Sequence, residues 1–298
     1  MREIPLQLPV QALTLVNLVT GNKIEFDNEN YILSNKITDT LAVQHNTSKT
    51  IKQIGEYITS SNVNSRDINL TGYIIGKSEL DLKQKKRELL NLTNPLQEVQ
   101  VIVDNKYQVT GKCQSPVKWA TTHENNNDKF VKFTIDILVP TTLWTDLEPT
   151  VVSLSPYVDT FIMPGHMSEA DPMSFGHKTD DLLTNIYNEC NVDVPLKITI
   201  TALNTVTDPE IIRVNDDTIF KLNCTMQPGD VIVINTKFGS KKVTKNGINI
   251  LGSVDLLNST WIMLKPGLNT FTFSCGKKDE KSGLNISFMY YNNYWGVV

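Results

Sequence analysis

The chain has 298 residues, of which 40% are hydrophobic and 20% are charged, and its formal net charge at pH 7 is −4. This length suits two domains better than one hydrophobic core. The charge balance gives no indication of a general polyanion-binding surface, and no apolar run approaches the roughly 20 residues that span a bilayer. The start, MREIPLQLPVQ, does not have the basic and apolar regions of a secretory signal.

The first part of the chain predicts strands and a long polar segment. Residues 13–33 predict strands around a turn at Thr20-Gly21-Asn22. Residues 34–65 are rich in Ser, Thr and Asn and predict a long loop or a protruding hairpin arm, which at that length in a compact domain is usually functional or disordered. Residues 66–75 predict a strand that has Ile68, Leu70 and Ile74 on one face.

One amphipathic helix is predicted over residues 78–93. Ser78 is a plausible N-cap, and Asp81 lies in the first turn, where the helix dipole favours a negative charge. Asn94-Pro95 ends the helix, because the residue before proline disfavours the α region. Leu82 and Leu89 are expected on a different face from Lys85 and Lys86. A cluster of basic residues is either a contact surface or, as we favour, a solvated face: Lys83, Lys85, Lys86 and Arg87.

Strands resume after the helix and lead to a domain boundary near residue 143. Residues 130–140 alternate cleanly, which predicts a strand with one buried face. Residues 143–192 contain several prolines and little periodicity, so we interpret them as a connector into the second domain. From Val194 onward the alternation returns, and Asn246-Gly247 and Pro266-Gly267 predict tight turns within a meander over residues 229–274. The predicted fold class is mainly β with one substantial helix.

Two sets of residues resemble the distal tail proteins of long-tailed bacteriophages. One is GDVIVINT, KKVTKNG and LKPGLNTFTF, in that order, within residues 229–274. The other is the run from Arg66 to Ile74 with Gly72, followed by the basic helix, Asn94-Pro95 and a hairpin. The resemblance covers about residues 15–275 and is weak over 150–190. Similar proteins often have a Pro-aromatic-Trp pattern at the exit from the first domain. This chain has Trp144 at that place but does not have the full pattern.

The resemblance implies the organisation and the partners. Residues 1–142 would form a β-sandwich-type domain with one α-helix that assembles into a hexameric hub ring. Residues 143–298 would comprise the connector and a galectin-like β-sandwich. The ring would join the tail tube protein to the tail-associated tip protein, with receptor-binding or other baseplate proteins at the periphery, and provide a conduit for DNA. The protein would reside in the virion, at the tail tip or baseplate, after assembly in the host cytoplasm.

We add one hypothesis about the ring. The polar arm at 34–65 is our candidate for reaching a neighbouring subunit. This hypothesis would be refuted if deletion of residues 40–62 left the oligomer intact.

The sequence predicts no catalytic, cofactor-binding or metal-binding residues, and therefore no enzyme. His166 and His177 lie near Asp171, Asp180 and Asp181, but their spacing is not one that a helix or strand uses for metal ligands. Phosphate-loop and G-x-S-x-G motifs are both absent. Asp216-Asp217 is interpreted as a turn rather than a glycosidase pair. Four cysteines without close spacing are interpreted as reduced thiols: Cys113, Cys190, Cys224 and Cys275.

The alternative function is a carbohydrate-binding module that contacts host cell-wall saccharide. Aromatic side chains can stack on sugar rings, although in strands they are more often core or interface anchors. Loss of glycan binding on Trp295→Ala would support this alternative. The aromatic candidates are Trp119, Trp144, Trp261, Trp295, Tyr290, Tyr291 and Tyr294.

Overall fold

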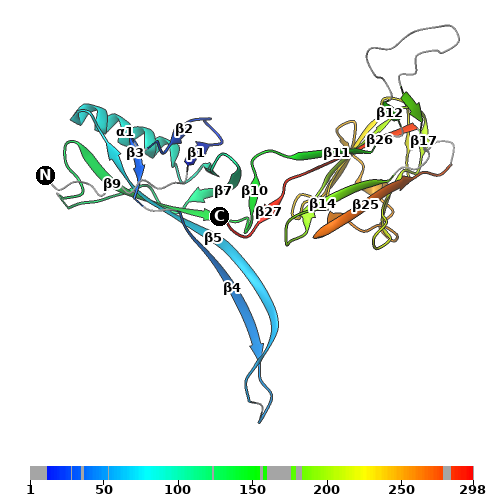
Figure 1. Ribbon diagram of the computed structural model, residues 1–298, viewed down its shortest axis with the longest axis horizontal. Coiled ribbons are helices and arrows are strands. Elements are labelled where there is room, and N and C mark those ends of the chain that lie inside the picture. The colour runs from blue at the N-terminus through cyan, green and yellow to red at the C-terminus, as the bar shows by residue number, and fades with distance from the viewer. Residues whose placement is uncertain are drawn as a thin grey trace, which may run out of the picture. The chain divides into compact units, whose positions relative to one another are not determined.

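A computed structural model describes two compact units of the chain (Figure 1). The first unit runs as far as Leu147 and also contains the residues from Tyr294 onward, and the second runs from Glu148 to Asn293. The sequence predicts the division after residue 142, with the whole remainder in the second domain. The residues described are 12–27, 29–34, 37–52, 54–122, 124–154, 157–159, 176–178, 183–277 and 283–297, of which 38–40, 157–159 and 176–178 are described by their backbone alone.

The first unit is built on one sheet of eleven strands. The strands are β1 (Leu13–Asn17), β2 (Lys23–Glu25), β3 (Tyr31–Leu33), β4 (Thr38–Ser48), β5 (Tyr57–Ile75), β6 (Glu98–Val103), β7 (Tyr107–Cys113), β8 (Lys118–Trp119), β9 (Phe130–Val139), β10 (Trp144–Asp146) and β27 (Asn293–Tyr294). The main path of the sheet runs β2-β1-β6-β7-β9-β5-β3. Off this path, β4 pairs with β5, β8 with β9, and β10 with both β7 and β27.

Alternating side chains of β5 and β9 form the centre of the first core. Ile68, Leu70 and Ile74 of β5 are buried, as their period-two spacing predicted. The same holds for the apolar side chains of β9, which are Val131, Phe133, Ile135, Ile137 and Val139. Gly72 allows β5 to approach its neighbours, because a Cβ there would meet the carbonyl oxygen of Ile32 and the ring of Phe133.

The predicted helix is confirmed as α1 (Glu79–Leu92). The Ser78 hydroxyl accepts a hydrogen bond from the backbone N–H of Asp81 at 3.2 Å, which satisfies one of the free N–H groups of the first turn. The Asp81 carboxylate in turn accepts from the backbone N–H of Lys77 at 2.7 Å. Leu82, Leu89 and Leu92 are buried beneath the helix, so its apolar side packs on the sheet.

Lys85 does not face away from the helix leucines, and that prediction is wrong. It lies three residues after Leu82 and four before Leu89, a spacing that places all three side chains on one side of a helix. Its side chain is only 13% exposed, and its ammonium donates to the backbone oxygen of Ile75 at 2.8 Å and pairs with Asp81 at 3.0 Å. Burial of the stem, with the charge satisfied by nearby oxygens, explains how a lysine occupies this position.

The second unit contains the strands β11 (Thr150–Leu154), β12 (Tyr157–Asp159), β13 (Gly176–Lys178), β14 (Thr184–Asn188), β15 (Val194–Pro195), β16 (Lys197–Ala202), β17 (Val206–Thr207), β18 (Glu210–Arg213), β19 (Thr218–Lys221), β20 (Thr225–Met226), β21 (Val231–Asn235), β22 (Lys242–Lys245), β23 (Ile248–Asn249), β24 (Met263–Leu264), β25 (Gly267–Ser274) and β26 (Leu284–Tyr290), with a 3-10 turn η1 (Leu251–Ser253). Its largest sheets have the orders β11-β26-β16-β21-β22-β23 and β14-β25-β18-β19.

These two sheets form a β-sandwich. Phe271 of β25 and Phe288 of β26 stack across the core with ring centroids 4.8 Å apart. The alternating apolar side chains of β16 that the sequence singled out are all buried: Ile198, Ile200 and Ala202, with Leu196 just before the strand. The chain is therefore mainly β with one substantial helix, as the sequence predicted.

Turns of the second unit also follow the sequence. Asn246 has φ 50° and Gly247 has φ 83°, a pair of positive values that suits the right-handed twist of a two-residue hairpin. Asp217 adopts φ 52° between β18 and β19, which confirms that Asp216-Asp217 forms a turn. The side chain of Asp216 pairs with Arg213 at 2.6 Å and with Lys265 at 2.9 Å. The hydrogen bond from Arg213, aided by that from Lys265, holds the pKa of the Asp216 carboxyl well below its usual range.

Candidate interaction surfaces

The polar segment after β3 forms a long hairpin arm. Strands β4 and β5 pair over almost their full length, and β5 continues from the arm into the core of the first unit. Figure 1 shows the two strands extending well beyond the rest of the sheet. Side chains of β5 are exposed from Tyr57 to Ser65 and begin to be buried at Arg66. Of the two predictions for this segment, the protruding hairpin is therefore the one that the structure shows.

One face of the arm, which we call the apolar face, carries Val43, Val63 and Ile58, with the hydrogen-bonded pair His45 and Ser61 between them. Val43 lies opposite Val63, and Thr47 lies opposite Ile58, so each pair projects to one side of the hairpin. Alternation along β4 places Val43, His45 and Thr47 on the same side. A register shift between Asn46 and Thr47 brings Ile58 onto this face. Val43, Ile58 and Val63 are all exposed, so this unit leaves the face uncovered.

The opposite face of the arm carries amides and hydroxyls. Gln44 lies opposite Asn62, and Asn46 lies opposite Ser60. The Asn46 amide donates to the Ser60 hydroxyl at 2.8 Å. The two faces therefore differ in chemistry, and only one of them would gain by burial against another protein surface.

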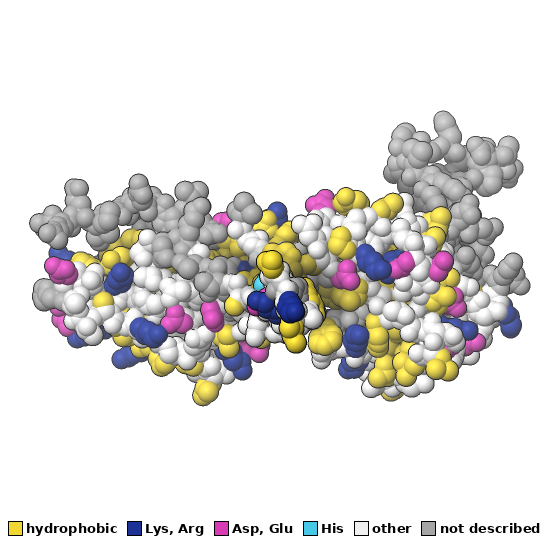
Figure 2. All heavy atoms as spheres, turned by 90° about the horizontal axis from the view of Figure 1, so that it is seen from below, with side chains coloured by type: hydrophobic (Ala, Val, Ile, Leu, Met, Phe, Trp, Pro, Cys, Tyr) yellow, Lys and Arg dark blue, Asp and Glu magenta, His cyan; other side chains and the backbone are white. Residues whose placement is uncertain are grey.

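The arm ends in a tip with two exposed isoleucines. Ile51 and Ile54 are 92% and 101% exposed, and they are close in sequence to Lys49 and Lys52. Figure 2 looks onto the end of the arm and shows hydrophobic and basic side chains side by side there. Ile51 and Ile54 therefore add exposed apolar surface at the end of the hairpin.

Arg66 anchors the base of the arm. This side chain is almost fully buried, and its guanidinium donates to the backbone oxygens of Thr142 at 3.0 Å and of Trp295 at 2.5 Å. It also lies over the ring of Trp144, 5.9 Å from the ring centroid. Arg66 therefore ties β5 both to the exit of the first unit and to its C-terminal segment. The sequence indicated Arg66 only through the family pattern and did not predict these partners.

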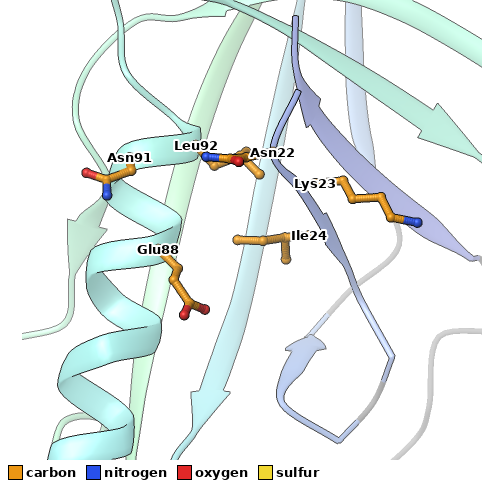
Figure 3. A pocket seen from close by; sticks show the side chains of 6 residues that line it. All are labelled: Asn22, Lys23, Ile24, Glu88, Asn91 and Leu92. Carbon is orange, nitrogen blue, oxygen red and sulfur yellow. The ribbon is translucent and has the colours of Figure 1, made fainter. Parts of the chain in front are cut away.

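A small pocket lies between α1 and β2. It has a volume of about 270 Å³ and is lined by Asn22, Lys23, Ile24, Glu88, Asn91 and Leu92. Figure 3 shows Ile24 pointing towards the helix and the ammonium of Lys23 pointing away from it. Lys23 instead pairs with Glu25 at 2.8 Å. With an apolar floor and one carboxylate from Glu88, this pocket brings together no nucleophile and base.

The residues considered for catalysis or metal binding are not brought together in the described part of the chain. His177 lies in β13, whereas His166, Asp171, Asp180 and Asp181 fall outside the described residues. The described residues include no group of three or more His, Cys, Asp or Glu side chains arranged to hold a metal ion. All four cysteines are thiols outside any disulfide, with Cys113 and Cys190 buried, and burial raises the pKa of the Cys113 thiol to about 11.

The aromatic candidates for sugar stacking are divided between the two units. Trp295 is part of the first unit, and Tyr294 packs edge-on against Tyr107 there at 5.1 Å between ring centroids. Trp144 and Tyr290 are buried. Trp261 is in the second unit, where it packs on Phe220 at 5.1 Å. Trp295 therefore does not belong to the β-sandwich in which the carbohydrate alternative placed its site.

The helices in the described ranges include none whose length and apolarity would let it cross a membrane.

Comparison with known proteins decides the family. Residues 19–139 match the family model of the phage tail protein RIFT-related domain, and residues 189–295 match that of the siphovirus-type tail component, C-terminal domain. Together these matches cover well over half of the chain. The chain belongs to the phage distal tail protein family. A comparison with curated proteins found no significant match.

Solved structures of distal tail and baseplate proteins share the fold. The Dit protein of phage SPP1 has been described as a paradigm of the hub adsorption apparatus in phages that infect Gram-positive bacteria. It is 11% identical to this chain with a TM-score of 0.67, and the match covers 95% of this chain and 99% of that one. A chain of the phage P2 baseplate, in its activated conformation with calcium, is 11% identical with a TM-score of 0.54, over 97% and 100%. A chain of the same baseplate with strontium is 12% identical with a TM-score of 0.51, and the match covers 97% of this chain and 100% of that one.

These findings confirm the predicted family and the mainly β fold with a galectin-like C-terminal domain. Members of this distal tail family are structural components of the phage tail and baseplate, and this chain has the tail hub role of the family.

Proposed function

We propose that this distal tail protein forms a hexameric ring that joins the tail tube protein to the tail-associated tip protein. The ring provides a conduit for DNA, and receptor-binding or other baseplate proteins attach at its periphery. Its role is structural rather than enzymatic. Assembly takes place in the host cytoplasm, and the ring is then part of the tail tip of the virion.

The arm is the observation that carries the ring proposal. Its apolar face, formed by Val43, Ile58 and Val63, extends beyond the core of its own unit and is exposed. Contact of this face with a different surface of the next copy is a heterologous interface. Such an interface forms a closed ring when the rotation between neighbouring copies adds up to a full turn. Because β5 runs without interruption from Tyr57 to Ile75, the arm is held by the core and presented in one direction.

The test removes the arm while keeping the sheet. Replacing residues 43–63 by Asn-Gly joins the remaining strands through a two-residue hairpin turn. We expect the wild-type chain to form a sixfold ring with a central hole in negative-stain electron microscopy and the variant to lose it. Light scattering measures the mass of each in solution.

A matched pair of variants separates the two faces. Replacing Val43, Ile58 and Val63 by serine makes the apolar face polar and should abolish the ring. Serine at Gln44 and Asn62, on the other face, should leave it intact. A ring that survives removal of the arm contradicts the proposed contact, and copies that remain monomeric even with the tail tube and tip proteins co-expressed contradict the ring itself.

A further inference from the structure

One side of the second unit is basic and apolar. Lys237, Phe238, Lys241 and Lys242 lie on the turn between β21 and β22 and at the start of β22, and all are exposed. Phe238 is 89% exposed, and the ammonium of Lys241 lies over the ring of Trp261, 5.3 Å from its centroid. We refer to Lys237, Phe238, Lys241 and Lys242 as the lysine flank.

The other side of the same unit is acidic and apolar. Glu148 precedes the edge strand β11, and Glu189 and Asp193 follow the edge strand β14; all three are exposed. Val151 of β11 and Tyr187 of β14 are exposed beside them. We refer to Glu148, Val151, Tyr187, Glu189 and Asp193 as the acidic flank.

The strand register places the two flanks at the same level of the sandwich. Val151 pairs with Met289, Met289 with Lys197, Lys197 with Asn235, and Asn235 with Lys242. These residues form one row across five strands, from the acidic flank to the lysine flank. At a spacing of ~4.8 Å per strand, the two ends of this row are about 19 Å apart. The flanks of one copy therefore cannot neutralise each other.

Within the described part of the second unit, the charged groups of the two flanks are not used in ion pairs, although the Lys241 ammonium contacts the Trp261 ring. Each flank thus combines available charge of one sign with exposed apolar side chains. Complementary charge fixes the register of an interface, and the apolar side chains supply area to bury.

We propose that the lysine flank of one copy binds the acidic flank of the next copy. The occupant of each flank is thus a second copy of this chain, chosen because the two surfaces are opposite in charge, level in the sheet and located on opposite sides. Such a contact is heterologous and repeats around an axis. The inference rests on the proposed ring and deepens it, because it adds a contact between second units to the one made by the arm.

Zero-length cross-linking tests the contact directly. A carbodiimide joins an ammonium to a carboxylate only where they touch, and the separation of the flanks within one copy excludes links inside a chain. In the full-length wild-type oligomer we expect cross-linked peptides that join Lys237, Lys241 or Lys242 to Glu148, Glu189 or Asp193. Mixing isotopically light and heavy chains before assembly identifies the links as intermolecular.

Charge reversal provides the functional readout. Changing Lys237, Lys241 and Lys242 to Glu should remove these cross-links and weaken the oligomer about tenfold or more at low salt, because like charges then face each other. Changing Glu148, Glu189 and Asp193 to Lys should do the same. Reversing both flanks in one chain should restore cross-linking. Lys197→Glu, on the central strand β16, is the matched control and should have no such effect.

The outcomes separate this inference from the proposed ring. A ring that forms without cross-links between the flanks, or whose stability the reversals leave unchanged, overturns this contact alone. A chain that stays monomeric together with the tail tube and tip proteins overturns the ring and this contact together.

Discussion

Gly72 sits where two neighbouring strands leave no room for a side chain, and Gly72→Ala tests that packing. The added Cβ would lie 2.8 Å from Cζ of Phe133 and closer still to the backbone oxygen of Ile32. Carbon atoms in ordinary contact are about 3.5–4.0 Å apart, so the ring would have to move by about 1 Å. It has little space to do so, since Phe133 is fully buried and packs against Phe26 with ring centroids 6.1 Å apart.

The cost follows from these two contacts. Overpacking a filled core costs about 1–3 kcal/mol and occasionally more. Here one obstacle is the backbone of β3, which pairs with β5 through Leu33 and Gly72 and cannot rotate out of the way. We therefore expect Gly72→Ala to lower the free energy of unfolding of the first unit by about 3 kcal/mol, at the upper end of that range.

Guanidinium unfolding followed by tryptophan fluorescence measures this effect, because three of the four tryptophans lie in the first unit, namely Trp119, Trp144 and Trp295. Gly296→Ala, also in the first unit, is the control, since a Cβ at Gly296 meets nothing within 4 Å and its backbone is not in the left-handed region. Its unfolding free energy should change by less than about 1 kcal/mol. A Gly72→Ala protein as stable as the control would refute the packing argument.

Two further predictions concern contacts made by charged side chains. Arg66→Met should lower the unfolding free energy of the first unit by about 2–5 kcal/mol, because two backbone carbonyls lose a charged hydrogen-bond donor. It should also speed hydrogen exchange near Thr142 and Trp295, and unchanged exchange at both places would contradict the predicted role of Arg66. Asp216 has a depressed pKa, so its contribution to stability is present above the unfolded value of about 3.9 and is lost as pH falls through the folded pKa. The stability difference between wild type and Asp216→Asn should therefore be constant above about pH 5 and shrink towards pH 2, and a difference independent of pH would count against this ion pair.

Local features of the fold could be predicted from the sequence. Period-two alternation identified the buried faces of β5, β9 and β16, because a strand with one core face must alternate. The Ser78 cap and Asn94-Pro95 located both ends of α1. Asn246-Gly247 identified a hairpin turn, since few other dipeptides accept two positive φ values.

Features that depend on distant pairing could not be predicted. The sequence does not say that β1 pairs with β6 or that Tyr294 returns to the first unit, because period and turn signals carry no information about partners far along the chain. Lys85 was placed on the wrong side because its charge was weighed more than its spacing from the leucines. The apolar face of the arm was missed because a register shift moves Ile58 onto it, and the surrounding Ser and Asn residues concealed it.

The family resemblance predicted the role more fully than the residues did. Each motif was a common β pattern by itself, and their order across the chain was what indicated a tail hub. The interaction surfaces, in contrast, required the structure. Lys242 and Glu189 are unremarkable in sequence and acquire meaning only when the sheet places them on opposite sides of one unit.

The return of Tyr294 to the first unit has a consequence for the order of folding. β10 pairs with β27, and Arg66 binds the backbone of Trp295, yet both partners are synthesised after the entire second unit. Most of the first unit leaves the ribosome early but lacks these contacts until translation has passed residue 295. A chain interrupted within the second unit therefore carries an arm whose anchor is incomplete. The base of the arm can therefore gain its C-terminal contacts only after the second unit has been synthesised.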